Sequence, residues 1–275
     1  FFSFCYMSLI CVSAFADTDV TVATDDGNTS IVNTLSWAID QVNNADSTSP
    51  IVIESSASSL TVSGVAPPAV TTSLTVESYE EGTNVTITGW DVVVQPPTGS
   101  STAPTCTFQN VVLDTSSITL NNGNISLATQ GTYTVSNDII LGSGSGSILF
   151  PTFGSDVTFT GDISGTGPLT FQGSDSLFSA TLTGVNSWTG GLVVSGGSVS
   201  FEEITAFPDG TDITLNSGSV QFALVSGTDY TISSTISGGG IFLGPGNFTL
   251  TGNISVGLIM APSSNHRNVP IKHFP

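Results

Sequence analysis

Residues 157–164 read Val-Thr-Phe-Thr-Gly-Asp-Ile-Ser, and residues 248–255 read Phe-Thr-Leu-Thr-Gly-Asn-Ile-Ser. In both stretches apolar and hydroxyl side chains alternate until a Gly-Asp or Gly-Asn pair interrupts them, which is the pattern of a short β-strand ending in a turn. The pattern continues from Asp17 onward, and strands are expected at Val85–Thr88, Ile118–Leu120, Val157–Phe159, Leu192–Val194 and Phe248–Leu250. Many short strands separated by turn residues indicate an all-β sandwich, barrel or solenoid.

Internal repetition favours the solenoid among these architectures. Three pairs of segments match at offsets of 95, 97 and 91 residues: Ile118–Gly123 with Ile213–Gly218, Tyr133–Ser136 with Tyr230–Ser233, and Val157–Ser164 with Phe248–Ser255. These matches predict that residues 118–164 and 213–255 are two copies of one unit. A stack of similar coils accommodates such copies because each coil contacts only its neighbours. Parallel coils would place Thr, Ser and Asn side chains outside and Val, Ile, Leu and Phe side chains inside.

One segment, Thr34–Asn44, has the period of a helix instead. Its apolar residues fall at i, i+3, i+4 and i+7 and so share one helical face: Leu35, Ala38, Ile39 and Val42. Asn33 or Thr34 is the expected N-cap. We expect this helix to cover the open edge of the first coil, since an uncovered strand edge invites aggregation.

The chain opens with an uncharged apolar run, Phe1–Phe15. The sequence Ala14-Phe15-Ala16 before Asp17 is the small-residue pattern that signal peptidase cleaves. The run is shorter than the ~20 residues that a membrane-spanning helix needs. We therefore interpret residues 1–16 as a cleaved export signal, which predicts secretion or display on the cell surface.

The composition is acidic and nearly free of cations. The 275 residues include 21 Asp and Glu but 2 Lys and Arg, for a formal net charge of −19, together with 30 Gly, 41 Ser and 38 Thr. The mean hydropathy of +0.30 argues against disorder. Nucleic acid is excluded as a partner because neutralising phosphates requires Lys and Arg, and binding to anionic lipid is disfavoured for the same reason. Direct insertion of this segment into a membrane is not expected either.

Part of the chain resembles a known family. Phe159–Thr170, Phe-Thr-Gly-Asp-Ile-Ser-Gly-Thr-Gly-Pro-Leu-Thr, is followed by Ala180–Val199, which contains Leu182-Thr-Gly-Val-Asn-Ser-Trp-Thr-Gly-Gly191 and ends in Gly196-Gly-Ser-Val199. This order is similar to the repeat in passenger regions of bacterial autotransporters, with Trp188 in the aromatic position and Asp212–Val220 as the following strand–turn step. The resemblance covers about 60 residues and implies a right-handed parallel β-helix that extends from the cell surface.

Four pairs of acidic residues are candidates for glycoside hydrolysis, which needs two carboxylates roughly 5–10 Å apart: Asp25/Asp26, Glu80/Glu81, Glu202/Glu203 and Asp209/Asp212. We interpret each pair as solvated turn acids. If Glu202 and Glu203 lie on a strand, their side chains point to opposite faces. Asp209-Gly-Thr-Asp212 has the composition of a turn.

The sequence lacks the residues that nucleophilic, triad and lyase catalysis require. Cleavage of the signal would remove Cys5 and Cys11 and leave Cys106, which has no basic neighbour and is expected to be buried and inert. A triad needs a His, and both His266 and His273 lie in the last ten residues. Lyase chemistry on acidic sugars would need a cation in the body of the chain. We therefore expect no catalytic residue, no cofactor-binding residue and no metal ligand.

The sequence divides into four parts. Residues 1–16 are the export signal, 17–64 the N-terminal cap and first coils, 65–260 the β-helical repeat region, and 261–275 an atypical tail. Both cations, Arg267 and Lys272, fall in this tail. The repeat pattern stops near Leu258–Pro262, which suggests a frameshift or truncation there, with more passenger and a membrane barrel encoded downstream.

The sequence thus predicts an all-β protein, a right-handed parallel β-helix with a short N-terminal capping helix. The expected function is that of a secreted or surface-exposed passenger fragment, a non-enzymatic stalk with an adhesin-like role whose partner is a host surface or a glycan. The alternative is a freestanding secreted β-helix that binds or hydrolyses neutral polysaccharide. Convergence of aromatic residues on one face, above all Trp37, Trp90 and Trp188, would favour the alternative.

Overall fold

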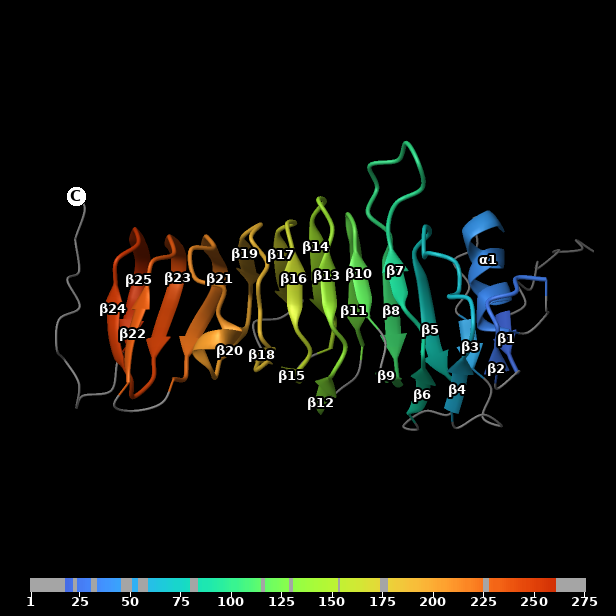
Figure 1. The fold of residues 1–275 in the computed structure, drawn as a ribbon, viewed down its shortest axis with the longest axis horizontal. Helices are drawn as coiled ribbons and strands as arrows, with labels where there is room; N and C mark the ends of the chain where they lie inside the picture. Colours follow the sequence, from blue (N-terminus) through green and yellow to red (C-terminus); the bar gives the residue numbers. More distant parts are fainter. Residues whose placement is uncertain are drawn as a thin grey trace, which may run out of the picture.

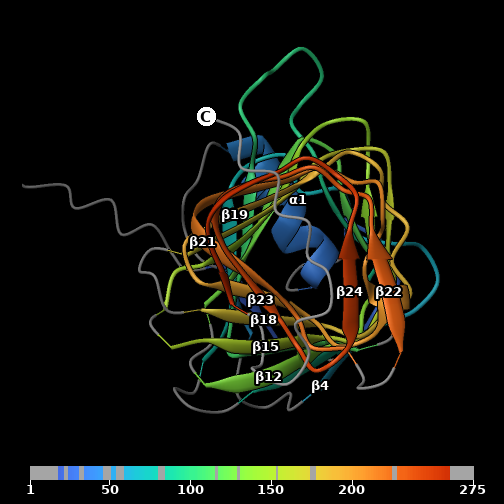
Figure 2. The same cartoon turned by 90° about the vertical axis from the view of Figure 1, so that its left-hand side faces the viewer.

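The computed structural model describes residues 18–21, 24–30, 34–45, 51–53, 59–79, 84–114, 117–128, 131–152, 154–173, 178–224 and 228–260. They form a right-handed parallel β-solenoid, with the N-terminal coils at one end and the C-terminal coils at the other (Figures 1 and 2). This architecture confirms the predicted fold class. The predicted export signal and the predicted tail, residues 261–275, lie outside the described residues.

The first face of the solenoid is one long parallel sheet. Its strands follow one another in the order β1 (Thr18–Val20), β3 (Ile51–Ile53), β5 (Leu74–Ser78), β8 (Thr105–Gln109), β11 (Gly123–Leu127), β14 (Gly146–Phe150), β17 (Leu169–Gly173), β19 (Leu192–Ser195), β21 (Ile213–Phe222), β23 (Ile236–Leu243) and β25 (Ile254–Met260). Every pair along this order is parallel and joins neighbouring coils, which is the hydrogen-bonding pattern of a solenoid.

The second face follows the first along the chain. Its N-terminal sheet contains β2 (Thr24–Asp25), β4 (Ser59–Val62), β6 (Val85–Thr88) and β9 (Val111–Asp114). Its C-terminal sheet contains β12 (Thr132–Val135), β15 (Asp156–Phe159), β18 (Ser179–Leu182) and β20 (Ser198–Phe201), and it continues into the second halves of β21, β23 and β25. In the last coils one long strand therefore serves two faces.

The third face is made of two separate sheets. The first contains β7 (Val92–Val94), β10 (Ile118–Leu120), β13 (Ile139–Leu141) and β16 (Ile163–Gly165), and the second contains β22 (Asp229–Ile232) and β24 (Asn247–Leu250). Between them, a short 3₁₀ helix, η1 (Ile204–Ala206), lies in the connection from β20 to β21. The third face is thus interrupted in two successive coils, at residues 185–189 and 204–211. A loop, residues 95–104, projects from the solenoid between β7 and β8 (Figure 1), and residues 97–102 at its tip are exposed.

The core is built by in-register stacking of inward side chains. Ile125 on β11 pairs with Cys106 on β8 and with Ile148 on β14, and all three are fully buried. On the second face the rings of Phe201 and Phe222 stack with centroids 5.6 Å apart. Many outward positions carry hydroxyl and amide groups, as predicted, but apolar side chains also face outward, such as Val112 on β9 and Ile140 on β13. Burying an aliphatic or Phe side chain stabilises the fold by about 1.5–3 kcal/mol relative to leaving it exposed. Burial of these stacked side chains is therefore the main stabilising contribution.

The predicted helix is confirmed as α1 (Leu35–Ala45), at the N-terminal end of the stack (Figures 1 and 2). The four predicted apolar residues of its inner face are buried. Thr34 is the N-cap, because its Oγ1 accepts a hydrogen bond from the backbone N–H of Trp37 at 3.2 Å. The alternative cap, Asn33, lies outside the described residues.

The prediction that residues 118–164 and 213–255 are two equivalent copies is wrong, because the matching segments lie on different faces of the solenoid. Ile118–Leu120 forms β10 on the third face, whereas Ile213–Leu215 lies in β21 on the first face. Tyr133 lies on the second face and Tyr230 on the third. The matching segments are strand–turn–strand corners of the same kind, with positive φ at Asn122 (57°) and Ser217 (60°), but the second set is rotated by one face. The structural repeat is therefore the single coil.

Candidate functional site

The first predicted acidic pair is divided between the interior and the surface. Asp25 is buried, which corrects its interpretation as a solvated turn acid, whereas Asp26 is exposed. The Asp25 carboxylate accepts hydrogen bonds from the backbone N–H of Gly27 at 2.8 Å and of Ser36 at 2.6 Å. Ser36 lies in the first turn of α1, where N–H groups lack helical partners and a negative charge is favoured. Asp25 therefore joins the first coil to the capping helix.

The other three predicted acidic pairs lie outside the described residues or at the surface. Glu80 and Glu81 fall outside the described residues. Glu202 and Glu203 are both exposed, in a bend before η1 rather than on a strand. Asp209 and Asp212 are also exposed, and Asp209 lies in a turn closed by a hydrogen bond from the N–H of Thr211 to the carbonyl of Pro208, as the composition predicted.

Four aspartates that the sequence analysis did not identify as a group lie at the corners of the third face: Asp91, Asp138 and Asp162 come directly before a third-face strand, and Asp209 comes shortly after η1. One carboxylate oxygen of each accepts a hydrogen bond from a backbone N–H of the next coil: Asp91 from Ser117 (3.1 Å), Asp138 from Asp162 (2.9 Å), Asp162 from Val185 (2.7 Å) and Asp209 from Ser233 (2.7 Å). These four residues are called the aspartate row. For three of the four, the signal in the sequence is an Asp directly before an apolar third-face residue, as in Asp91-Val92, Asp138-Ile139 and Asp162-Ile163. These carboxylates join each coil to the next one.

The three tryptophans do not form an exposed platform. Trp90 and Trp188 are buried, with 0% and 1% of their surface exposed, and Trp37 packs partly buried on α1. The Trp188 indole N–H donates to the carbonyl of Gly191 at 3.1 Å, so the side chain closes the corner before β19. The aromatic position of the resembling segment is thus a packing position here.

Cys106 is buried inside β8, as predicted. Burial raises the pKa of its thiol well above the ordinary value, because the thiolate would be desolvated. A nucleophilic role requires the thiolate. The geometry therefore supports a packing role. The two His residues lie outside the described residues.

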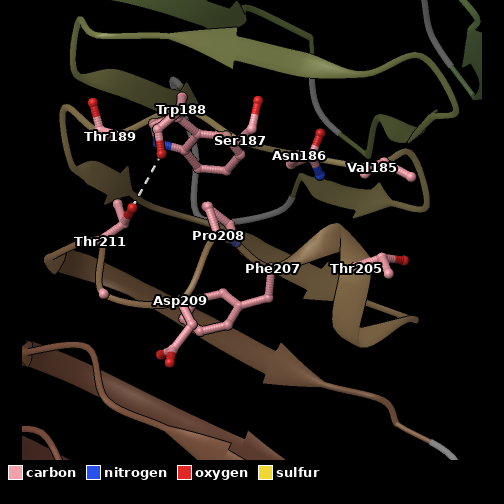
Figure 3. A pocket seen from close by; sticks show the side chains of 11 residues that line it. Val185, Asn186, Ser187, Trp188, Thr189, Thr205, Phe207, Pro208, Asp209 and Thr211 are labelled. Carbon is pink, nitrogen blue, oxygen red and sulfur yellow. Dashed lines mark hydrogen bonds between the residues drawn. The ribbon is translucent and has the colours of Figure 1, made fainter.

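One surface hollow lies where the third face is interrupted (Figure 3). It has a volume of about 500 Å³ and lies between residues 185–189 and residues 205–211. Buried Asn186 joins the two sides: its Oδ1 accepts from the N–H of Ile163 at 2.8 Å, and its Nδ2 donates to the carbonyl of Ala206 at 2.6 Å. The hydroxyl of Thr211 also donates to the carbonyl of Trp188 at 3.2 Å. This hollow is the candidate functional site.

Within the described ranges, His, Cys, Asp and Glu side chains form no group of three or more that could hold a metal ion. Among those same residues, no helix has the length and apolar character needed to cross a membrane. A scan of family models, a search of curated proteins and a search of solved structures each found no match to this chain. The fold is therefore established by strand register, and the function is a proposal from the site and the sequence.

Proposed function

We propose that this chain is a non-enzymatic β-helical stalk of the autotransporter-passenger type, exported to the bacterial cell surface, with an adhesin-like role. The observation that carries the proposal is the structural use of the segment that resembles the passenger repeat. Its Trp188 closes a coil corner, and Gly196 and Gly197 form the turn from β19 to β20 with φ of 80° and 62°. Glycine is favoured at such angles, so the resembling residues are those that a stacked coil requires.

The use of the acidic residues supports a stalk rather than an enzyme. Asp25 anchors α1, and the aspartate row accepts backbone hydrogen bonds between coils. Carboxylates that accept backbone hydrogen bonds from the next coil, in a repeated pattern, have a structural role in holding the coils together. Stacked coils also give a long surface, on which contacts with a partner can be distributed.

Export and display can be tested in bacterial cells that express the full-length gene. An epitope inserted in the exposed loop after Gly99 should be labelled by antibody on intact cells, because this loop projects from the solenoid. The mature N-terminus should be Asp17. An uncleaved protein that stays in the cytoplasm would overturn the proposal. Release into the medium together with hydrolysis of a neutral polysaccharide would favour the freestanding secreted β-helix instead.

A further inference from the structure

The second face of the solenoid is divided between β9 and β12. These two strands belong to successive coils, whose other strands do pair with one another: β8 with β11 on the first face and β10 with β13 on the third. β9 nevertheless ends the N-terminal sheet of the second face, and β12 begins the C-terminal one. Among the described strands none lies between them, and the step from β9 to β12 is wider than the step from β12 to β15 (Figure 1). The second face therefore has two open strand edges in the middle of the solenoid.

The open edge of β9 carries backbone groups that face the gap. The carbonyls of Asn110 and Asp114 accept hydrogen bonds from the coil of β6. Successive residues of a strand point their N–H and C=O groups to opposite sides, so those of Val111 and Leu113 point away from β6 and toward β12. Among the described residues these groups have no strand to pair with.

The open edge of β12 is complementary. The carbonyls of Gly131 and Val135 accept hydrogen bonds from the coil of β15. By the same alternation, the N–H and C=O groups of Thr132 and Thr134 point away from β15 and toward β9. A row of free N–H and C=O groups is a template for pairing with another strand. Here two such rows lie on the two sides of one gap.

Inward side chains beside the gap are less buried than their neighbours within the sheets. Val111 and Leu113 are half-buried, whereas Val85 and Ile87, which pair with them from β6, are 2% and 0% exposed. On β12 Tyr133 is half-buried too, and its hydroxyl is shielded from water without a hydrogen-bond partner among the described residues. A strand in the gap would cover these apolar surfaces.

Alternation and charge specify the occupant. Alternate side chains of an added strand point inward, beside Val111, Leu113 and Tyr133, where apolar residues fit. The side chains between them point outward, near Asp114 at the end of β9 and Asp156 on β15, which are both exposed. The chain has a net charge of −19 and no Lys, Arg or His in residues 1–265, so cations at the outward positions are attracted and anions are repelled.

We propose that the gap between β9 and β12 binds an extended peptide of a partner protein, in which apolar residues alternate with Lys or Arg. The peptide adds a strand to the second face and pairs with the free backbone groups of both edges. This inference goes beyond the proposed function, because a peptide-binding gap serves a displayed or a secreted protein equally.

The first test is a titration of the purified protein with a fluorescent eight-residue peptide of alternating Val and Lys, capped at both ends, followed by anisotropy. We expect a dissociation constant of about 10–100 μM and slower hydrogen exchange of the Thr132 and Thr134 amides. The same peptide with Glu in place of Lys should bind about tenfold more weakly or worse. Absence of binding of the Val–Lys peptide at about 1 mM, or equal binding of the two peptides, would overturn the proposed partner.

Peptides methylated on alternate backbone nitrogens test whether both edges are used. A strand between β9 and β12 donates hydrogen bonds on both sides. Methylation of the Val nitrogens or of the Lys nitrogens should therefore each weaken binding by about tenfold or more. A strand added to a single open edge loses affinity with only one of the two sets. Loss with only one set would overturn the placement in the gap.

A pair of variants places the binding on the second face. Val112 points outward from β9 and is 37% exposed, so Val112→Lys puts a cation beside the gap and should weaken binding of the Val–Lys peptide by about threefold or more. Ile140→Lys is the matched control, since Ile140 is 42% exposed on β13 of the third face, and it should leave binding unchanged. Equal effects of the two variants would overturn the inference. The proposed stalk function would still stand, because display and adhesion do not require this gap.

Discussion

The third face contains two kinds of construction in one chain. From β7 to β16 it is a ladder in which each strand pairs in register with the next, as Ile118 does with Val92 and with Ile139. At residues 185–189 and 204–211 the ladder gives way to side-chain bridges, a 3₁₀ helix and a hollow. In both regions the third-face part of a coil comes after the second-face strand and leads the chain back to the first face of the next coil.

The difference shows what a solenoid tolerates. In the ladder, the backbone at Gly165 lies so close to the preceding coil that an added methyl group would meet the carbonyl of Leu141. In the interruption, one buried amide, that of Asn186, replaces part of the lost backbone pairing and leaves the outer surface open. The coil can therefore carry a site on its third face while its strands on the first and second faces stay paired with the neighbouring coils.

The largest effect is expected from a methyl group added in the ladder. Gly165 has φ of 116°, and an added Cβ would overlap the carbonyl of Leu141 on the preceding coil. Backbone strain and overlap together should lower the free energy of unfolding of Gly165→Ala by about 3–5 kcal/mol. The control is Gly210→Ala at the hollow, where φ is 86° and the space is open, with an expected loss of about 1–2 kcal/mol. Urea melts measure both, and equal losses would mean that the two regions are packed alike.

The next effect concerns the bridge. Asn186→Ala should cost about 2–4 kcal/mol, since it deprives the N–H of Ile163 and the carbonyl of Ala206 of their buried partner. Asn124→Ala on the outside of β11 is the matched control. Its amide makes one long contact, 3.4 Å to the Thr105 hydroxyl, and its loss should cost about 0.5 kcal/mol or less. A small loss at Asn186 in the same urea melts would show that the hollow does not depend on this bridge.

A smaller effect is expected along the aspartate row. Asp138→Ala removes the acceptor for the N–H of Asp162 and should cost about 0.5–1 kcal/mol. Asp138→Asn keeps an acceptor oxygen and removes one negative charge from an acidic chain, so it should be at least as stable as the unchanged protein. Thermal melts at low ionic strength compare the two variants. If Asp138→Asn is as unstable as Asp138→Ala, the charge rather than the acceptor stabilises the coil.

The smallest effect is common to both regions. With a net charge of −19 and no Lys, Arg or His in residues 1–265, the charges repel one another and destabilise the fold at low salt. Monovalent salt should therefore raise the melting temperature through screening. A melting temperature that does not change from low to moderate ionic strength would contradict this account of the charge.

The individual strands and the helix could be predicted from local sequence pattern. How they assemble into coils could be predicted only in part. Alternation along Val85–Thr88 and the helical period of Leu35, Ile39 and Val42 reflect which side chains must be buried, and both predictions are confirmed. The phase of the repeat was not predictable, because a strand–turn match such as Ile118–Gly123 with Ile213–Gly218 does not reveal which face a corner joins.

The candidate site was hidden for a related reason. The hollow depends on contacts between residues 20 or more positions apart, such as Asn186 with Ala206 and Asp209 with Ser233. A single sequence contains no direct signal for such pairs. Asp25 was likewise assigned to the surface because its partner Ser36 lies 11 residues away.

The in-register parallel stack is the central claim, and disulfide trapping tests it most directly. Thr158 on β15 pairs with Thr181 on β18, which in turn pairs with Ser200 on β20. In a Cys106→Ala background, the Thr158→Cys/Thr181→Cys protein should form a disulfide under mild oxidation, because neighbouring parallel strands lie ~4.8 Å apart, within the range a disulfide bridges. The Thr158→Cys/Ser200→Cys protein spans two strand spacings and should stay reduced. Failure of the first pair to cross-link, or equal cross-linking of the second, would contradict the solenoid.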